Sequence, residues 1–384
     1  MTTMHDVIVI GGGSMGAAAA WQLAQKGKNV LALEQFDIPH TKGSYHGESR
    51  LIRFAYKQGD HYVPLLLRAR DLWREIEQHT GEKLFFDVGG LSIAAPETEA
   101  YLEGVYRSVK KYDIPHKVMT GAEVNKQYPA FNLPHDFIAV HDSWAGYLLS
   151  EKAVPAFARL AQAAGANIMT NTKVLSWGSD GSTVTVTTDK GAHKAEKLVI
   201  APGAWFSTLV PEFNTVLKTI RVAISWYAPQ NKAAFTPDKM PIFIMRDRTD
   251  RNGCYGLPIC DAVPGMKIGQ HFHLGEEVTG DSIDRAPTPA DEHVTRYWTD
   301  TFFDLKDAPC LNTAICMYTK TPDEAFILGL HPRHENVILG HACSGHGFKF
   351  APVIGEILSD LATDGTTRHD IAAHMPQRFQ QEVS

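Results

Sequence analysis

The sequence predicts an α/β protein, α+β overall, in which a Rossmann-like domain is interrupted by a second domain built on a large mixed or antiparallel sheet. Three observations support this prediction. The chain opens with an apolar run, a glycine-rich turn, an alanine-rich segment and a second apolar run, which is the order strand, turn, helix, strand. An apolar strand ending in a glycine turn recurs at residues 197–205, and a strand, a glycine-rich loop and an apolar helix recur at residues 336–361. Pieces of one sheet are therefore expected at both ends and in the middle of the chain.

This arrangement divides the 384 residues into two discontinuous domains. The first is predicted to comprise residues 1–84, 150–216 and 325–384, and the second residues 85–149 and 217–324. Apolar periodicity indicates further helices at residues 62–79 and 150–165. Strands are predicted at residues 85–93, 167–174 and 183–188, and the segment 217–318 is strand-rich.

The glycines of the first turn have the G-x-G-x-x-G spacing, with Gly11 for the tight turn, Gly13 for close approach to a pyrophosphate and Gly16 for helix–strand packing. Ser14 and Met15 lie within this turn, where free N–H groups at the helix start hold phosphates. Glu34 ends the second apolar run, about 20 residues on, where a carboxylate accepts hydrogen bonds from a ribose hydroxyl. The motif predicts a dinucleotide and leaves NAD and FAD open.

Composition excludes several other classes of function. Hydrophobic residues make up 44% and charged residues 21% of the chain, as in ordinary soluble proteins, and the net charge of −6 gives no reason to expect nucleic acid or an anionic membrane surface as a partner. No apolar run reaches membrane-spanning length, and residues 1–6 lead directly into the first strand, which leaves no room for a signal peptide. The five cysteines form no C-x-x-C pair, and His271 and His273 have no third ligand at sensible spacing. We therefore expect a cytoplasmic protein with reduced thiols and no metal site.

A long polar loop at residues 39–53 carries several basic side chains beside the expected phosphate site. A loop of this length in a compact domain is usually functional or disordered. It is interpreted either as a set of anion contacts or as a solvated basic loop.

Four blocks of sequence resemble the family of monomeric sarcosine oxidase and N-methyl-L-tryptophan oxidase. They are Pro39 to Arg53 with its histidines and glycines, Lys267-Ile-Gly-Gln-His271, the run from Cys316 to Thr321 with Asp323 and Glu324, and Ser344-Gly-His-Gly-Phe-Lys-Phe350. Enzymes of this family carry FAD attached to a cysteine, oxidise secondary amino acids and pass electrons to oxygen. The resemblance implies FAD rather than NAD, and it implies a monomer.

Within this resemblance Cys316 matches the cysteine that bears the flavin thioether. Formation of the thioether needs a thiolate, so positive charge or donors are expected beside Cys316. The alternative interpretation is that Cys316 is a small buried hydrophobic residue.

Arg53 and Lys349 match the pair that binds the substrate carboxylate, for which a guanidinium fork and a second cation are suited. Their alternative is two unrelated surface cations.

The resemblance places Arg50 and Lys267 beside the flavin ring. One-electron transfer to oxygen gives superoxide, so a fixed positive charge lowers that barrier, and Lys267 is predicted to supply it. The alternative interpretation is that Lys267 lies on a strand and points to water.

Tyr255 and His271 match residues that shape the amine pocket, and His271 is expected to titrate near working pH and to tune amine protonation. Further cofactor contacts are implied at the following positions: Ser44, Ser49, Val174, Gly203, Gly345, His346, Gly347 and Phe348.

The sequence thus predicts an FAD-dependent oxidase of N-methyl amino acids such as sarcosine, giving the amino acid, formaldehyde and hydrogen peroxide. Its partners are a small secondary amino acid and oxygen. Alternative substrates are N-methyl-L-tryptophan, proline, pipecolate or a fructosyl amino acid. The sequence also leaves open a dehydrogenase with another electron acceptor and a non-catalytic nucleotide-binding module. One departure from the family is the strongly charged segment 245–253, which leaves the size and polarity of the preferred side chain open.

Overall fold

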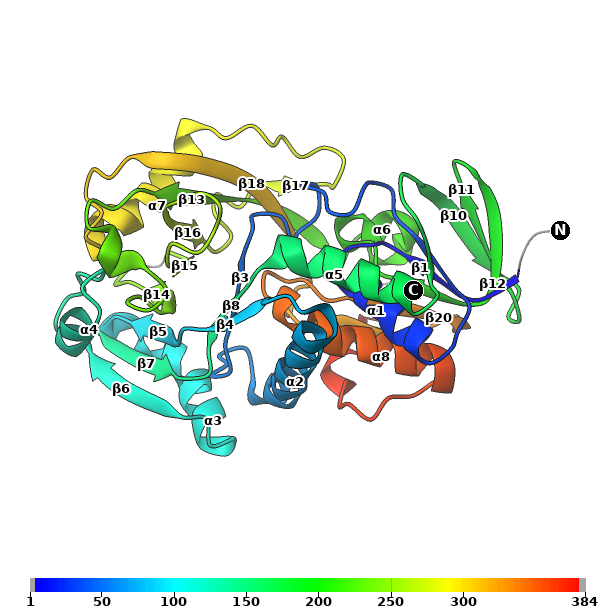
Figure 1. The fold of residues 1–384 in the computed structure, drawn as a ribbon, viewed down its shortest axis with the longest axis horizontal. Coiled ribbons are helices and arrows are strands. Elements are labelled where there is room, and N and C mark those ends of the chain that lie inside the picture. Colours follow the sequence, from blue (N-terminus) through cyan, green and yellow to red (C-terminus); the bar gives the residue numbers. More distant parts are fainter. Residues whose placement is uncertain (1–3, 250, 380–384) are drawn as a thin grey trace.

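The computed structural model describes residues 4–249 and 251–379 and contains three sheets in that part of the chain (Figure 1). The first sheet has eight strands, in the order β10-β11-β12-β1-β2-β9, with β20 beside β12 and β19 beside β20. The pairs within β9-β2-β1-β12-β20 are parallel, whereas β10-β11-β12 and β19-β20 are antiparallel. The strands are β1 (Met4–Ile10), β2 (Val30–Leu33), β9 (Asn167–Met169), β10 (Val174–Ser179), β11 (Val184–Thr188), β12 (Gly191–Ile200), β19 (Ile327–His331) and β20 (His334–His341).

Alternating side chains of β1 bury both faces of this sheet. Val7 and Val9 pack into the core shared with four helices, and Ile8 and Ile10 pack into a second core beneath β10 and β11. The four helices are α1 (Ser14–Gln25), α2 (Val63–Thr80), α5 (Ser150–Ala163) and α8 (Ala351–Asp364). The predicted doubly covered, largely parallel sheet is therefore confirmed.

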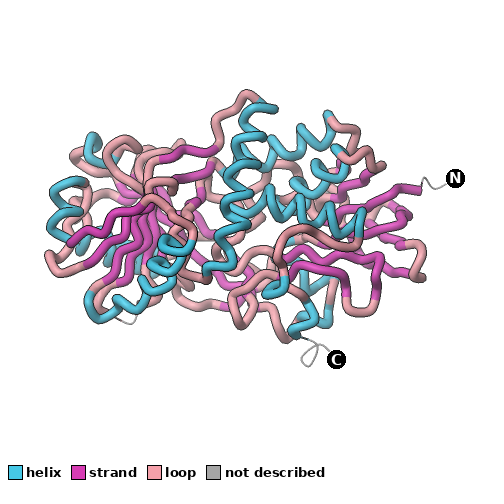
Figure 2. Tube along the Cα trace, turned by 90° about the horizontal axis from the view of Figure 1, so that it is seen from below, coloured by secondary structure: helices cyan, strands magenta, loops and turns pink. Residues whose placement is uncertain are grey.

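The second sheet has nine strands, in the order β17-β13-β16-β15-β14-β5-β7-β6, with β18 on β13. Only the β14–β5 pair is parallel among its described pairs, so the sheet is mixed, as predicted. In Figure 2 the strands gather toward the two ends of the molecule, with most helices between them. The strands are β5 (Gly90–Ala94), β6 (His116–Thr120), β7 (Ile138–Asp142), β13 (Lys218–Tyr227), β14 (Ile242–Arg246), β15 (Cys254–Leu257), β16 (Met266–Gln270), β17 (Glu277–Val278) and β18 (Cys310–Lys320).

A third, three-stranded sheet joins segments on both sides of the predicted domain limits. It contains β3 (Arg50–Ile52), β8 (Gly146–Leu148) and β4 (Phe85–Asp87). The end of the predicted 39–53 loop is thus a strand, because its backbone pairs with β8. The domain limits remain a prediction, and residues 1–3 and 380–384, which the first domain includes, lie outside the described residues.

The prediction that residues 217–318 are strand-rich is confirmed by β13 to β18, but two local details differ from the sequence predictions. The segment 217–318 also contains α7 (Pro289–Phe302). Its start is marked by a capping box of Thr288 and Asp291 and by Pro289 in the first turn. The predicted strand at 167–174 is divided between β9 and β10, because Asn171 has a φ of +52° and turns the chain. Three short helices complete the fold: α3 (Glu103–Lys111), α4 (Gly121–Gln127) and α6 (Phe206–Leu209).

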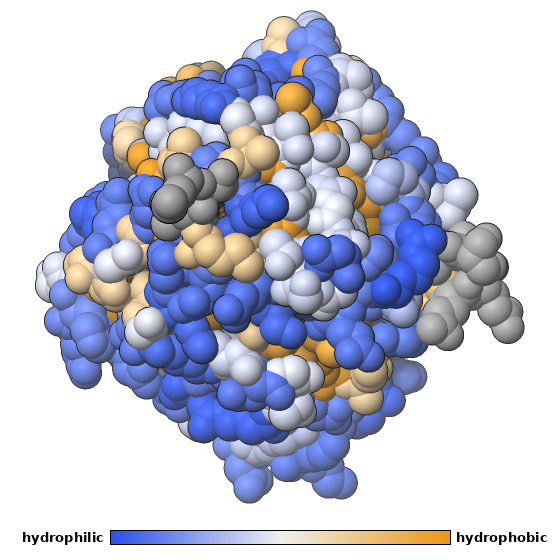
Figure 3. Space-filling view, turned by 90° about the vertical axis from the view of Figure 1, so that its right-hand side faces the viewer, coloured by the Kyte–Doolittle hydropathy of each residue, from blue (hydrophilic) through white to orange (hydrophobic). Residues whose placement is uncertain are grey.

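The surface is mixed in character. On the face shown in Figure 3 polar residues predominate and apolar ones form small, interrupted groups. None of the helices within residues 4–249 and 251–379 has the length and apolar character needed to cross a membrane. Over the same residues, no three His, Cys, Asp or Glu side chains are placed to hold a metal ion.

Candidate functional site

A cavity with about 1820 Å³ of empty space opens where the carboxyl ends of β1, β2 and β12 meet the second sheet. It receives side chains from the glycine turn, the 43–53 segment, β15, β18 and the loop after β20. Its lining includes most of the predicted site residues: Gly11, Gly13, Ser14, Met15, Glu34, Ser44, Arg50, Arg53, Val174, Gly203, Tyr255, His271, Cys316, Gly345, His346, Gly347, Phe348 and Lys349. Gly16, Ser49 and Lys267 do not line it.

Two of the three motif glycines are required by sterics within the chain, and the third leaves open space. Gly11 has a φ of +100°, and a Cβ there would lie 2.4 Å from the carbonyl oxygen of Ala201. A Cβ on Gly16 would lie 1.8 Å from the carbonyl oxygen of Gly11, whereas a Cβ on Gly13 would meet nothing within 4 Å. Helix α1 begins directly after Gly13 without a side-chain cap, so its first N–H groups are left for a ligand in the cavity. This geometry fits the pyrophosphate of a dinucleotide.

Glu34 holds the glycine turn in place. One carboxylate oxygen accepts the N–H of Gly12 at 2.7 Å and the other accepts the N–H of Phe36 at 2.9 Å. Burial raises the pKa of Glu34, and these backbone hydrogen bonds oppose the rise. Each oxygen keeps further acceptor capacity toward the cavity, as ribose binding requires.

Cys316 lies against Arg50, as the thiolate argument predicted. An Arg50 guanidinium nitrogen lies 3.5 Å from the Cys316 sulfur, and the guanidinium also donates to the carbonyl oxygens of Ser49 at 2.8 Å and Ser44 at 2.9 Å. Arg50 is thereby fixed by the backbone of the polar loop with its positive charge beside the sulfur. The 39–53 segment is therefore an ordered part of the cavity wall and not a solvated loop.

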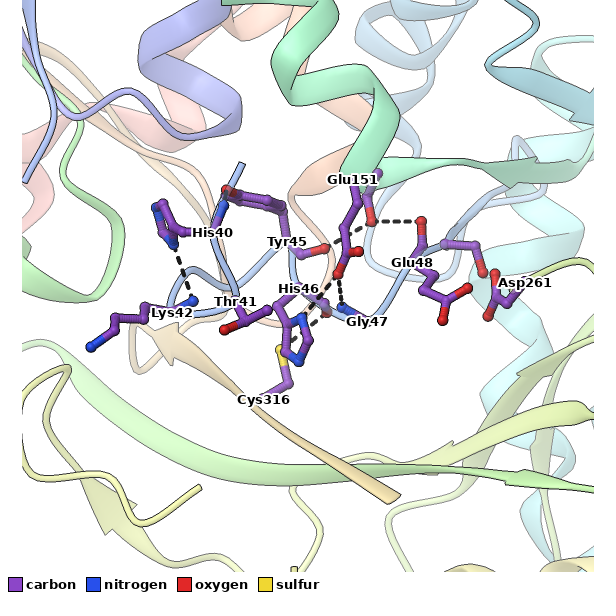
Figure 4. A network of polar contacts seen from close by, with 12 residues as sticks. His40, Thr41, Lys42, Tyr45, His46, Gly47, Glu48, Glu151, Asp261 and Cys316 are labelled. Carbon is purple, nitrogen blue, oxygen red and sulfur yellow. Dashed lines mark hydrogen bonds and ion pairs between the residues drawn. The ribbon is translucent and has the colours of Figure 1, made fainter. Parts of the chain in front are cut away.

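Glu151 anchors this loop, and the sequence analysis missed it. From the first turn of α5 its carboxylate accepts the N–H of Gly47 at 2.8 Å and contacts Nδ1 of His46 at 2.9 Å (Figure 4). The His46 contact is the main cause that lowers the pKa of Glu151 to about 2. In the sequence, an acidic residue at the start of a helix indicates only a favourable interaction with the helix dipole. The distant partners of Glu151 could therefore not be predicted.

Arg53 and Lys349 meet across the ring of Tyr56, a residue that the sequence analysis did not single out. The Arg53 guanidinium carbon lies 4.7 Å, and the Lys349 nitrogen 5.5 Å, from the ring centre. Both cations are buried, which excludes unrelated surface cations, and the pKa of Lys349 is held well below its usual value by burial and by Arg53. Nη1 of Arg53 is buried and has no hydrogen-bond partner among the described residues. A carboxylate in the cavity would satisfy this donor and offset part of the positive charge of the pair.

Lys267 is buried and paired, and its predicted place beside the flavin ring stays a prediction. It neither points to water nor lines the cavity: its nitrogen lies 2.7 Å from a carboxylate oxygen of Asp261, and both side chains are almost fully buried. The same nitrogen donates to the carbonyl oxygens of Gly47 at 2.8 Å and Ser49 at 3.1 Å and to the Ser49 hydroxyl, so Ser49 faces Lys267. The Trp226 indole donates to the same Asp261 oxygen at 2.9 Å. The charge of Lys267 is therefore paired with Asp261. The backbone of residues 47–49 separates this charge from the cavity.

Tyr255 and His271 line one end of the cavity with their rings 5.0 Å apart. Burial raises the pKa of Tyr255 to about 12. Burial, followed by the charges of nearby Arg and Lys side chains, lowers the pKa of His271 to about 3. The expectation that His271 titrates near working pH is therefore wrong, because desolvation and surrounding cations both disfavour the imidazolium.

Replacing His271 by Asn is expected to leave every inflection between pH 5 and 9 in the kcat/KM profile. Since the lowered pKa keeps the imidazole neutral throughout this range, its titration contributes no step there. Initial rates of oxygen consumption in overlapping buffers measure the profile. Loss of an inflection near pH 6 to 7 in the variant would contradict the neutral assignment.

Comparison with known proteins adds to this geometry. The chain matches the family described as FAD dependent oxidoreductase over residues 6–361. It is 37% identical over 377 residues to a monomeric sarcosine oxidase of Bacillus sp. (strain B-0618), an alignment that covers 97% of this chain and 95% of that protein. It is 34% identical over 383 residues to an N-methyl-L-tryptophan oxidase of Yersinia pestis (strain Pestoides F), with 98% and 99% covered. The open form of NikD, an unusual amino acid oxidase essential for nikkomycin biosynthesis, matches with a TM-score of 0.84 at 26% identity and covers 98% of each chain.

These matches confirm the family resemblance found in the four sequence blocks. They also agree with the cradle around Gly13 and the cavity beyond it. The chain belongs to the family of FAD-dependent oxidoreductases and is a flavoenzyme.

Proposed function

We propose that this enzyme oxidises N-methyl amino acids such as sarcosine. The observation that carries the proposal is the buried pair Arg53 and Lys349, whose positive charge has no carboxylate partner among the described residues and faces the cavity that the dinucleotide turn also lines. The relatives named as monomeric sarcosine oxidase and N-methyl-L-tryptophan oxidase support the same class of reaction.

In this proposal the residues orient a neutral secondary amine. Arg53 and Lys349 bind its carboxylate, while Tyr255 and the neutral imidazole of His271 enclose the amine end without adding charge. When bound, FAD would supply the acceptor for a hydride equivalent from the N-methyl group and would pass the electrons on to oxygen. The substrate loses a hydride equivalent and a proton to become an imine, and water then releases formaldehyde. The balance is N-methyl amino acid, oxygen and water giving amino acid, formaldehyde and hydrogen peroxide.

The remaining assignments belong to the same proposal. Residues 1–84, 150–216 and 325–384 form the FAD-binding domain, the other segments form the substrate domain, and the enzyme acts as a monomer, as the names of its relatives imply. The dinucleotide lies along Gly11, Gly13 and Glu34, with its flavin end near Arg50 and Cys316.

Anaerobic mixing with sarcosine tests the function directly. We expect bleaching of the flavin absorbance near 450 nm, followed on admission of air by one formaldehyde and one hydrogen peroxide per oxygen consumed. An enzyme that bleaches but consumes no oxygen is a dehydrogenase, and one that does not bleach with any secondary amine refutes the proposal. N-methyl-L-tryptophan is the second candidate substrate, because a relative with that name covers nearly the whole chain.

We further propose that FAD is attached through a thioether to Cys316. The support is the Arg50 nitrogen 3.5 Å from the sulfur, which places a donor with positive charge beside the atom that would form the bond. Acid-precipitated wild-type protein should keep its yellow colour in the pellet, whereas a Cys316→Ala protein should release it to the supernatant. Cys343→Ala, another thiol of the cavity wall, is the control and should keep the colour bound. Complete release from the wild type would contradict the link.

A further inference from the structure

Two more cations lie near the carboxylate pair, and no ion pair within the described residues neutralises them. Lys57 and Arg246 are both half-buried and approach the same ring: the Lys57 nitrogen lies 5.2 Å, and the Arg246 guanidinium carbon 5.7 Å, from the centre of Tyr101. The guanidinium of Arg246 donates to the carbonyl oxygen of Arg251 at 3.2 Å, a neutral acceptor. Neither cation forms a salt bridge with a carboxylate of the described residues.

The other arginines of the same hairpin are satisfied. Arg248 pairs with Glu97 and Asp136 through contacts of 2.6 to 2.7 Å, and Arg251 lies 4.2 Å over the ring of Tyr297. Arg246 is the residue at the root of the hairpin, at the end of β14, and it is the one left with neither an acidic partner nor a close ring face among these three. Arg246 lies two residues after Ile244 on β14, so it is on the same face of the strand as Ile244, which lines the cavity, although Arg246 itself does not.

All four cations act on one group of the cavity wall. After burial itself, the causes that lower the pKa of His271 are, in order, Arg246, Arg53, Lys57 and Lys349. The pKa of Lys57 is lowered by burial, Arg246 and Arg53, and only Glu324 acts on it in the opposite sense. Gln58, which also lines the cavity, accepts from Nη2 of Arg53 at 3.0 Å through a neutral amide. The amine end of the cavity thus has more positive charge than one substrate carboxylate neutralises.

We propose that the preferred substrate is an N-alkyl amino acid with a second carboxylate, bound between Lys57 and Arg246 while the first carboxylate occupies Arg53 and Lys349. This inference rests on the proposed oxidase function and names its substrate class. The second carboxylate gives Lys57 and Arg246 an acidic partner, whereas sarcosine, bound as a neutral amine with one carboxylate, leaves both unpaired. N-methyl-aspartate, N-methyl-glutamate and N-carboxymethyl amino acids belong to this class.

Matched acids and amides test the proposal, because they differ in charge and hardly in shape. Anaerobic flavin reduction is measured with N-methyl-aspartate against N-methyl-asparagine and with N-methyl-glutamate against N-methyl-glutamine, in both enantiomers, with sarcosine as reference. We expect at least one acid to exceed its amide tenfold or more in the second-order rate constant for reduction. Acids that react no faster than their amides overturn the proposal.

Variants assign the effect to the two cations. Arg246→Gln and Lys57→Gln should each reduce the acid-to-amide ratio at least fivefold while changing the rate with the amide less than twofold. Arg248→Gln removes a charge from the same hairpin and should leave the ratio unchanged. An equal loss with acid and amide in Arg246→Gln would show a structural role and contradict the assignment.

Binding without turnover separates this inference from the proposed function. Changes in the flavin spectrum on titration with succinate and glutarate should give dissociation constants at least tenfold below those of propionate and butyrate, and Arg246→Gln should remove the difference. If no secondary amine reduces the flavin but the dicarboxylates bind selectively, the oxidase function fails and the anion site stands. If sarcosine reduces the flavin and the dicarboxylates show no advantage, the anion site fails and the oxidase function stands.

Discussion

Replacing Lys349 by Met is expected to lower kcat/KM for N-methyl amino acids by a factor of about a hundred or more, without lowering the melting temperature. Removal of one partner of a buried charged contact costs about 2–5 kcal/mol, and each 1.36 kcal/mol is about tenfold in rate. The substitution stabilises the folded protein without substrate, because Lys349 is buried beside Arg53. Its lowered pKa shows that the site disfavours the charged ammonium. Methionine fills a similar volume without charge.

Steady-state kinetics and thermal unfolding of the same preparation measure the two effects. Sarcosine amide, which has no carboxylate, is the control substrate, and its rate should change less than threefold. Arg53→Met should resemble Lys349→Met, and the double variant should lose less than the product of the two single losses, because both cations serve one carboxylate. An unchanged kcat/KM would refute the carboxylate assignment, and a fall of several degrees in melting temperature would refute the burial argument.

Replacing Lys267 by Met is expected to slow reoxidation by oxygen much more than reduction by substrate, and also to destabilise the fold. The variant loses the positive charge proposed to act on the reduced site and leaves Asp261 buried with two neutral side-chain partners, the Trp226 indole at 2.9 Å and the Cys260 thiol at 3.7 Å. Breaking a buried ion pair in this way costs about 3–5 kcal/mol. Stopped-flow absorbance separates the two half-reactions.

Asp261→Asn distinguishes the charge of Lys267 from its structural role. The ammonium keeps its contacts with the carbonyl oxygens of Gly47 and Ser49, and its field toward the cavity is no longer cancelled, so reoxidation should be as fast as in the wild type or faster. The double variant Lys267→Met/Asp261→Asn should recover most of the melting temperature while remaining slow in reoxidation. If reoxidation recovers together with stability, the charge of Lys267 does not act on oxygen.

The predictable part of the molecule is the part encoded by local patterns. The spacing of Gly11 and Gly16 predicted their steric roles, since a positive φ at Gly11 and a close backbone approach at Gly16 exclude a Cβ, whereas the role of Gly13 toward a pyrophosphate stays a prediction. Cys316, Arg53 and Lys349 were found because short blocks around them resemble a known family, and the structure brings all three to one cavity. Helix α7 has a capping box that predicts its start, but the strand periodicity of the surrounding segment concealed it.

Partners far apart in the chain were not predictable. Lys267 reaches the carbonyl oxygens of Gly47 and Ser49 only because β16 folds against the 47–49 segment, and Tyr56 reaches Lys349 only because the loop before α8 packs near β3. The titration of His271 was predicted wrongly, since its pKa depends on burial and on cations from several segments.

The sequence by itself determined that this chain forms a discontinuous α/β fold with a dinucleotide turn and which residues carry positive charge near the site. Glycine spacing, apolar periodicity and side-chain type are properties of neighbouring residues, and they can therefore be recognised in the sequence alone. The tertiary structure alone decided which charges are neutralised. It pairs Lys267 with Asp261, brings Arg53 to Lys349, and leaves Arg246 without an acidic partner among the described residues. Electrostatic energy depends on distance and burial in space, so the charge of the cavity, and with it the substrate class, is fixed only when the chain has folded.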